Sequence, residues 1–172
     1  MRLNKHTGEV VWRTLEDKGG MWGSAFSSPI IATLAGQRQL LVQTREQLAG
    51  VNLTDGKVLW SQPVKAFRGM NILTPVACND TLFTSTYGGK TIGFKITQAE
   101  GRFEATQSWT HKAQGYMSTP VLVDGVAYTH LRRQRVMAIE VATWRVLWTS
   151  VNSFGKYWSL AAQRDRILAL DE

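Results

Sequence analysis

The ten residues 51–60, VNLTDGKVLW, decide the fold, because their pattern returns along the chain. Residues 3–12 read LNKHTGEVVW, and residues 139–148 read IEVATWRVLW. Each copy combines an apolar strand end, a tight turn and a short strand that closes on Trp. Gly8 and Gly56 suit such a turn because glycine accepts a positive φ.

Two copies of this pattern depart from it. In residues 139–148, Trp144 occupies the glycine position, so we expect a longer or differently shaped turn there. A diverged copy ends at Trp109.

A second landmark runs out of phase with the first, namely a hydroxyl residue at the head of an apolar strand. Its members are Ser28-Pro29, Thr74-Pro75, Thr119-Pro120 and Ser159-Leu160. Proline at the first residue of a strand costs no ladder hydrogen bond. Their spacings of 46, 45 and 40 residues match the period of the Trp pattern.

Residues 119–150 show what one period contains. Four short apolar strands are separated by turns at Asp124-Gly125, at the Arg-rich residues 132–135 and at residues 142–144. Units of four antiparallel strands with a period of about 40 residues are β-propeller blades. The sequence therefore predicts an all-β chain, a β-propeller of four-stranded antiparallel blades.

The phase of the repeat predicts one propeller segment over residues 1–172, with about four blade equivalents. We expect two closing strands, three whole blades and two opening strands, at 1–14, then 28–62, 74–111 and 119–150, then 158–172. Since Met1 falls just inside a strand, we expect a piece of a larger, roughly eight-bladed propeller. The alternatives are a small ring closed by the two half-blades, or a second copy that completes them, because unpaired strand edges invite pairing.

Composition narrows the class of protein. The chain carries 44% hydrophobic residues and a net charge of +7, but no apolar run long enough for a signal peptide or a membrane span. We therefore expect no direct membrane insertion. The lone Cys78 allows no intrachain disulfide and is interpreted as a core residue. The basic clusters at 132–135 and 164–166 are interpreted as solvated turn charge, with a weak anion-binding surface as the alternative, and no motif indicates nucleic acid.

The Gly-x-x-x-Trp ending resembles the tryptophan-docking motif of quinoprotein-type propellers with PQQ-type repeats. That family includes quinone-dependent alcohol dehydrogenases, a lipoprotein of outer-membrane assembly and many bacterial repeat proteins. The resemblance implies eight blades and a bacterial periplasm or cell envelope, if a signal lies outside this chain. It also implies that four tryptophans lock adjacent blades together, namely Trp12, Trp60, Trp109 and Trp148.

The dehydrogenases of this family use pyrroloquinoline quinone, calcium, an adjacent cysteine pair and a catalytic Asp. This chain has one cysteine, and acids such as Asp55, Asp80 and Asp124 fall in predicted turns. The three histidines occupy unrelated positions of the repeat. The sequence therefore favours a non-catalytic protein without a cofactor, and the alternative is a fragment of a quinone-dependent oxidoreductase with quinone and calcium.

Loops that lead into each first strand carry large aromatic and basic side chains. These are Trp22, Phe26, Arg68, Asn71, Tyr116, Lys156, Tyr157 and Trp158. Such side chains suit a protein or glycan surface, although packing at the loop base explains several of them equally well. The leading hypothesis is a scaffold that binds a protein or peptide at this rim, with Trp22, Arg68, Asn71, Tyr116, Lys156 and Trp158 as the candidate surface. The remaining blades or a second copy of the chain are the other expected partners.

Overall fold

A computed structural model describes residues 1–17 and 26–171. They form three four-stranded and two two-stranded antiparallel sheets. The first two-stranded sheet is β1 (Arg2–Leu3) and β2 (Val10–Trp12). The second is β15 (Trp158–Gln163) and β16 (Arg166–Asp171).

The three complete sheets follow the chain, each strand pairing with the next one. The first sheet holds β3 (Ile30–Leu34), β4 (Gln37–Gln43), β5 (Gln47–Asn52) and β6 (Val58–Pro63). The second holds β7 (Val76–Cys78), β8 (Thr81–Ser85), β9 (Thr91–Ala99) and β10 (Arg102–His111). The third holds β11 (Val121–Val123), β12 (Val126–His130), β13 (Val136–Glu140) and β14 (Arg145–Thr149). A short 3-10 helix, η1 (Phe67–Gly69), precedes β7.

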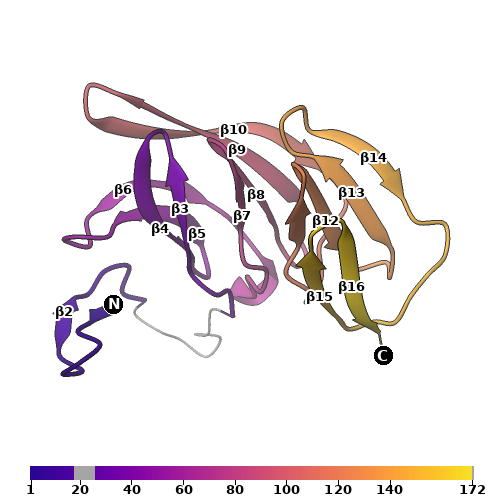
Figure 1. Cartoon of the computed structure of the whole chain (residues 1–172), viewed down its shortest axis with the longest axis horizontal. Helices are drawn as coiled ribbons and strands as arrows, with labels where there is room; N and C mark the ends of the chain where they lie inside the picture. The colour runs from indigo at the N-terminus through magenta and orange to yellow at the C-terminus, as the bar shows by residue number, and fades with distance from the viewer. Residues whose placement is uncertain (18–25, 172) are drawn as a thin grey trace.

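The sheets succeed one another as blades along a curved row, and the two chain ends lie apart (Figure 1). The first strands lie side by side, since β11 contacts both β7 and β15, and the outer strand β6 contacts β10. These antiparallel blades confirm the predicted fold class.

Apolar cores fill the spaces between neighbouring sheets. The first core joins Leu41 and Trp60 of one sheet to Leu82 and Phe94 of the next. The second core joins Phe83 to residues of the third sheet, including Met137 and Ile139. Successive side chains of a strand point to opposite faces, so Leu82 and Phe83 serve different cores. The middle sheet is therefore buried on both sides, as a blade within a propeller must be.

The turn at Trp144 differs from its expected shape. Trp144 has a φ of 62°, close to the 77° of Gly56 and the 76° of Gly8. Its N–H donates to the Glu140 carbonyl at 2.8 Å, just as the Gly56 N–H donates to Asn52 at 3.0 Å. The prediction of a longer or reshaped turn was wrong, because a bulky side chain here takes the left-handed conformation that usually selects glycine.

Contacts of Trp144 show what accompanies this unusual conformation. Its ring stacks on Trp109 of the preceding sheet, with centroids 5.4 Å apart and planes 8° apart. Trp109 in turn stacks on His111 at 5.7 Å. On β9, a Cβ added to Gly93 would lie 2.5 Å from the Trp144 ring. The turn of one blade thus inserts a ring against the outer strands of the blade before it.

The other predicted docking tryptophans lie in three different settings. Trp12 packs over Gly56 in the next sheet, where an added Cβ would lie 2.7 Å from its ring, and it donates to the Leu53 carbonyl at 3.3 Å. Trp60 is buried and donates to Gln39 of its own sheet at 2.8 Å. Trp148 is 47% exposed, because the sheet that follows it in the described structure has only β15 and β16. Its ring contacts the Tyr128 ring of its own sheet in a tilted arrangement.

None of the helical structure in the described residues is long and apolar enough to cross a membrane.

Candidate functional site

Antiparallel connectivity sends the loops to two ends of the blade row. The loops entering each first strand and the turns between second and third strands share one end, here called the loop end. Turns between first and second strands and between third and fourth strands share the other, here called the hairpin end. Most of the predicted surface residues belong to the loop end, because they were chosen from loops that enter first strands.

Four aromatic rings from three blade junctions form a continuous row at the loop end. Phe67 meets Tyr87 at a centroid distance of 5.9 Å, Tyr87 meets Tyr116 at 5.8 Å, and Tyr116 meets Tyr157 at 5.9 Å. We call Phe67, Tyr87, Tyr116 and Tyr157 the aromatic row. Its two ends are open to solvent, with Phe67 51% and Tyr157 39% exposed, whereas Tyr116 is buried beneath them.

Three basic side chains lie on the faces of this row. The Arg68 guanidinium lies 5.0 Å from the Phe67 centroid, and the Arg132 guanidinium lies 5.2 Å from Tyr87. The Lys156 ammonium lies 5.1 Å from Tyr157. At these distances a cation is attracted by the ring quadrupole, so the rings fix where the positive charges stand.

Backbone hydrogen bonds hold the row in place. The Phe67 N–H donates to the Tyr87 carbonyl at 2.7 Å, and Gly88 leaves room for Phe67, since an added Cβ there would lie 2.7 Å from the Phe67 Cβ. The Tyr116 N–H donates to His130 at 3.2 Å, and the Arg132 N–H donates to Gln114 at 2.8 Å. Neighbouring loops therefore support one another, and the row is formed before any partner arrives.

Electrostatics reinforce this arrangement. Burial, and next a hydrogen bond with Tyr157, raise the pKa of Tyr116, so its phenol stays protonated. A hydrogen bond with Tyr157 raises the pKa of Lys156, so its ammonium stays charged. The row is thus a surface of neutral rings carrying fixed cations.

Several predicted surface residues lie elsewhere. Asn71 is fully buried and donates to the carbonyls of Thr44 at 2.8 Å and Val64 at 2.9 Å, so its proposed place on the surface is corrected to a loop anchor. Trp158 is half-buried, and its ring stacks on His130 with centroids 4.9 Å apart. Its indole N–H donates a hydrogen bond to the Asp171 carboxylate at 2.6 Å. Phe26 is 57% exposed, and its N–H donates to the Asn71 carbonyl at 3.2 Å. Trp22 lies outside the described residues.

Sequence reasoning missed two members of the site, Phe67 and Tyr87, and included Arg132 only in the alternative of a weak anion-binding surface at residues 132–135. Tyr87 lies in the turn between β8 and β9, and Arg132 lies in the turn between β12 and β13. The sequence analysis interprets such positions as hairpin turns or as solvated charge. The signal that could have found them is the shared end: in an antiparallel blade, the turn after the second strand meets the loop before the first.

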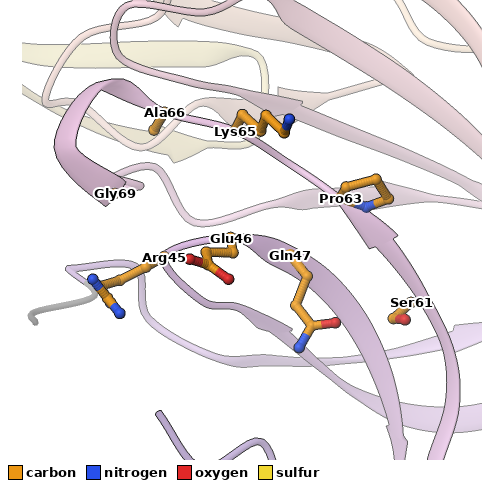
Figure 2. Close-up of a pocket in the computed structure, with 8 residues that line it drawn as sticks. All are labelled: Arg45, Glu46, Gln47, Ser61, Pro63, Lys65, Ala66 and Gly69. Atoms are coloured by element: carbon orange, nitrogen blue, oxygen red, sulfur yellow. The ribbon is translucent and has the colours of Figure 1, made fainter. Parts of the chain in front are cut away.

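A hollow of about 600 Å³ is lined by residues that flank Phe67 in the sequence and by residues of the turn between β4 and β5 (Figure 2). It is lined by Arg45, Glu46, Gln47, Ser61, Pro63, Lys65, Ala66 and Gly69. The labelled side chains point in different directions and share no centre. Arg45 forms an ion pair with Asp17, so this hollow offers no convergent reactive groups.

The alternative function would require pyrroloquinoline quinone and calcium. Among the described residues, no three His, Cys, Asp or Glu side chains gather closely enough to hold a metal ion. Cys78 is the single cysteine of the chain and lies half-buried beside the second core. The part of the chain that the structure describes therefore shows neither an acidic cluster for calcium nor the adjacent cysteine pair of the quinone-dependent dehydrogenases.

Comparison with known proteins agrees with the fold. In the solved structures, BamB from Moraxella catarrhalis covers 98% of this chain with a TM-score of 0.70 at 17% identity, and the chain covers 51% of that protein. A quinohemoprotein alcohol dehydrogenase from Pseudomonas putida HK5 covers 76% of the chain with a TM-score of 0.55 at 12% identity, and the chain covers 21% of it. At such identities these likenesses show the fold, which is a β-propeller of PQQ-type repeats.

The family follows from the sequence comparisons. The family model described as outer membrane protein assembly factor BamB matches residues 1–150, so the chain belongs to this family. A curated relative of that name from Yersinia pestis is 26% identical over 187 residues, which include 98% of this chain. The chain spans 44% of that relative's length.

Proposed function

We propose that this chain is a non-catalytic part of a protein-binding propeller that serves outer membrane protein assembly, as the names of its relatives state for them. The observation that carries the proposal is the aromatic row. Its solvent-open ends and ring-bound cations combine the residue types enriched where proteins meet. The partner is a protein or peptide that contacts the loop end.

The place of action follows from the same relationship. We propose that the chain works in the bacterial cell envelope, on the periplasmic side of the outer membrane. Its contribution is a rigid surface, since backbone hydrogen bonds between neighbouring loops hold the row. No covalent chemistry is required of it.

Photocrosslinking in the native cell tests this function. The photoreactive residue p-benzoylphenylalanine replaces Phe67 or Tyr157 in the protein expressed from its own locus. A matched control replaces Thr54, which is exposed on the hairpin end. We expect crosslinks from the loop end to a protein that mass spectrometry identifies as an outer membrane protein or a component of its assembly machinery. Equal crosslinking from Thr54, or none from either row position, would contradict the proposal.

The alternative, a piece of a quinone-dependent oxidoreductase, has a separate test. Pyrroloquinoline quinone and calcium are added to the purified protein, and quinone absorbance and thermal stability are followed. Since the described residues provide no calcium donor set, we expect neither signal to change.

A further inference from the structure

The two ends of the blade row carry opposite charge. Six loops of the loop end are described in full, at 44–46, 64–75, 86–90, 112–120, 131–135 and 150–157. Together they hold nine Lys or Arg residues and one acidic residue, Glu46. The partly described loop before β3 adds Arg13, Glu16 and Asp17.

Turns of the hairpin end show the reverse balance. They hold three basic residues, Lys5, Lys57 and Arg164. Their acidic residues number six, namely Glu9, Asp55, Asp80, Glu100, Asp124 and Asp165. The net charge of +7 is therefore concentrated on the end that carries the aromatic row, and a field of one sign steers an oppositely charged partner.

Two of the cations of the row, Arg132 and Lys156, are available to such a partner. Arg132 and Lys156 are exposed, and they take part in none of the ion pairs found among residues 1–17 and 26–171. Arg132 donates to the Gln114 amide oxygen at 3.3 Å, which leaves other guanidinium donors for a carboxylate. Charged partners would therefore not have to displace an internal ion pair at these two positions.

The spacing of the cations indicates the form of the partner. Each cation lies on a different ring, and successive ring centroids are separated by just under 6 Å. An extended chain advances about 3.3 Å per residue, so the row matches about six residues of extended peptide. Cations held on different rings suit carboxylates spaced along a chain, whereas a single phosphate group would need cations that converge.

We propose that the aromatic row binds an extended acidic segment of the partner protein, with carboxylates on Arg132 and Lys156 and apolar side chains between them against the rings. This inference rests on the proposed function and adds the chemistry of the segment that is recognised. A lipid surface of anionic headgroups would be a different partner, and the experiment below separates the two.

The test uses a fluorescein-labelled dodecapeptide of alternating glutamate and tyrosine, and a matched peptide with glutamine in place of glutamate. Binding to the full-length protein is followed by fluorescence anisotropy at low and physiological salt. We expect the acidic peptide to bind at least tenfold more tightly than the neutral one, and added salt to reduce the difference. The double variant Arg132→Gln/Lys156→Gln should weaken binding about fivefold, since each exposed pair contributes modestly.

Controls separate this surface from general basic charge. Lys57→Gln/Arg164→Gln removes the same charge from the hairpin end and should leave the affinity unchanged. Arg132→Lys/Lys156→Arg keeps the charges and should retain most of the binding. Circular dichroism of each variant checks that the fold is intact.

Three outcomes would overturn the inference. One is equal affinity for both peptides, and another is equal loss in the two charge-removal variants. The third is binding to phosphatidylglycerol vesicles, dependent on Arg132 and Lys156, without binding to the acidic peptide. If crosslinks from Tyr157 still identify a protein partner in these cases, the proposed function stands and only the acidic character of its segment falls.

Discussion

Trp144 shows how one residue can occupy a position that usually selects glycine. Its φ of 62° is unfavourable for a bulky side chain, and such strain persists only where the surroundings maintain it. Here the ring is held between Trp109 and the flat surface at Gly93. The favourable free energy of stacking offsets the cost of the left-handed backbone conformation that Trp144 adopts.

A double-mutant cycle tests this contact. Gly93→Ala places a methyl group within 2.5 Å of the Trp144 ring, so we expect it to lower the free energy of unfolding by about 1–3 kcal/mol through overpacking. In a Trp144→Ala background the same methyl group has room, and its cost should fall markedly. Urea unfolding of the four proteins measures the coupling, and additive effects would show that Trp144 does not press on Gly93.

Gly56 provides a second prediction at the scale of one residue. Gly56→Ala forces both a left-handed alanine and a clash with Trp12, whereas Gly36→Ala at φ 79° meets nothing within 4 Å. Both variants carry the backbone cost of about 1 kcal/mol, and only Gly56→Ala should also release the β1–β2 hairpin. Hydrogen exchange of residues 2–12 should accelerate in Gly56→Ala alone. Equal exchange in the two variants would refute the role of Trp12 as a dock.

At the scale of elements, the junction between β12 and β15 contains a buried histidine. His130 on β12 stacks on Trp158 at 4.9 Å. Burial lowers the pKa of His130, while the backbone of Gly155 and the carboxylate of Asp171 act more weakly in the opposite direction. The junction therefore favours the neutral imidazole.

The sign of the pH dependence follows. As the pH falls, His130 takes up a proton near pH 6.5 in the unfolded chain and only at a lower pH in the folded chain. The contribution of His130 to the free energy of unfolding is therefore present above pH 6.5 and is lost as the pH falls below it. His130→Phe keeps a ring on Trp158 without a titrating group. Thermal unfolding between about pH 8 and 5 should show a steeper fall of Tm in the wild type than in His130→Phe. The exposed His6→Phe is the control, and parallel curves for wild type and His130→Phe would contradict the prediction.

The strands could be predicted from the sequence because their evidence is local. Short apolar runs and the Asp124-Gly125 turn depend on neighbours in the chain, and the structure places a left-handed pair of residues at that turn. The aromatic row could not be predicted in full. Phe67 and Tyr87 come from one blade, but Tyr116 and Tyr157 come from the loops that follow, and only the packing of blades brings them together. The prediction for the shape of the Trp144 turn was wrong for the same reason, since the stacking partner Trp109 belongs to another sheet.

At the scale of the whole molecule, β16 is the outer strand of the last sheet that the described residues form. Among the described strands it pairs with β15 alone. Leu168 and Leu170 on this strand are 57% and 75% exposed. An apolar, unpaired edge is a template for another strand, so it accepts a strand of a neighbouring blade or of a second chain.

We expect the 172-residue chain to associate through this edge as its concentration rises. Light scattering coupled to size exclusion should give masses that increase above 19.3 kDa. Leu168→Lys/Leu170→Lys should suppress the increase, because charge on an edge strand opposes pairing. Val151→Lys, at an 85% exposed loop position, is the matched control and should not. A constant monomer mass for the wild type would overturn the expectation.

Unequal blade junctions have a consequence for how the polypeptide assembles. Trp12 rests on a glycine turn, whereas Trp109 rests on the indole of Trp144. Repeat proteins risk misassembly when similar units exchange neighbours during folding. A Cβ added at Gly56 would lie 2.7 Å from the Trp12 ring, so a turn with tryptophan in the glycine position would crowd Trp12, and we expect the junctions to act as keyed pairs. Differences between the repeats then ensure that each blade packs only against its correct neighbour. We expect a chimera with exchanged turns to misassemble at these junctions.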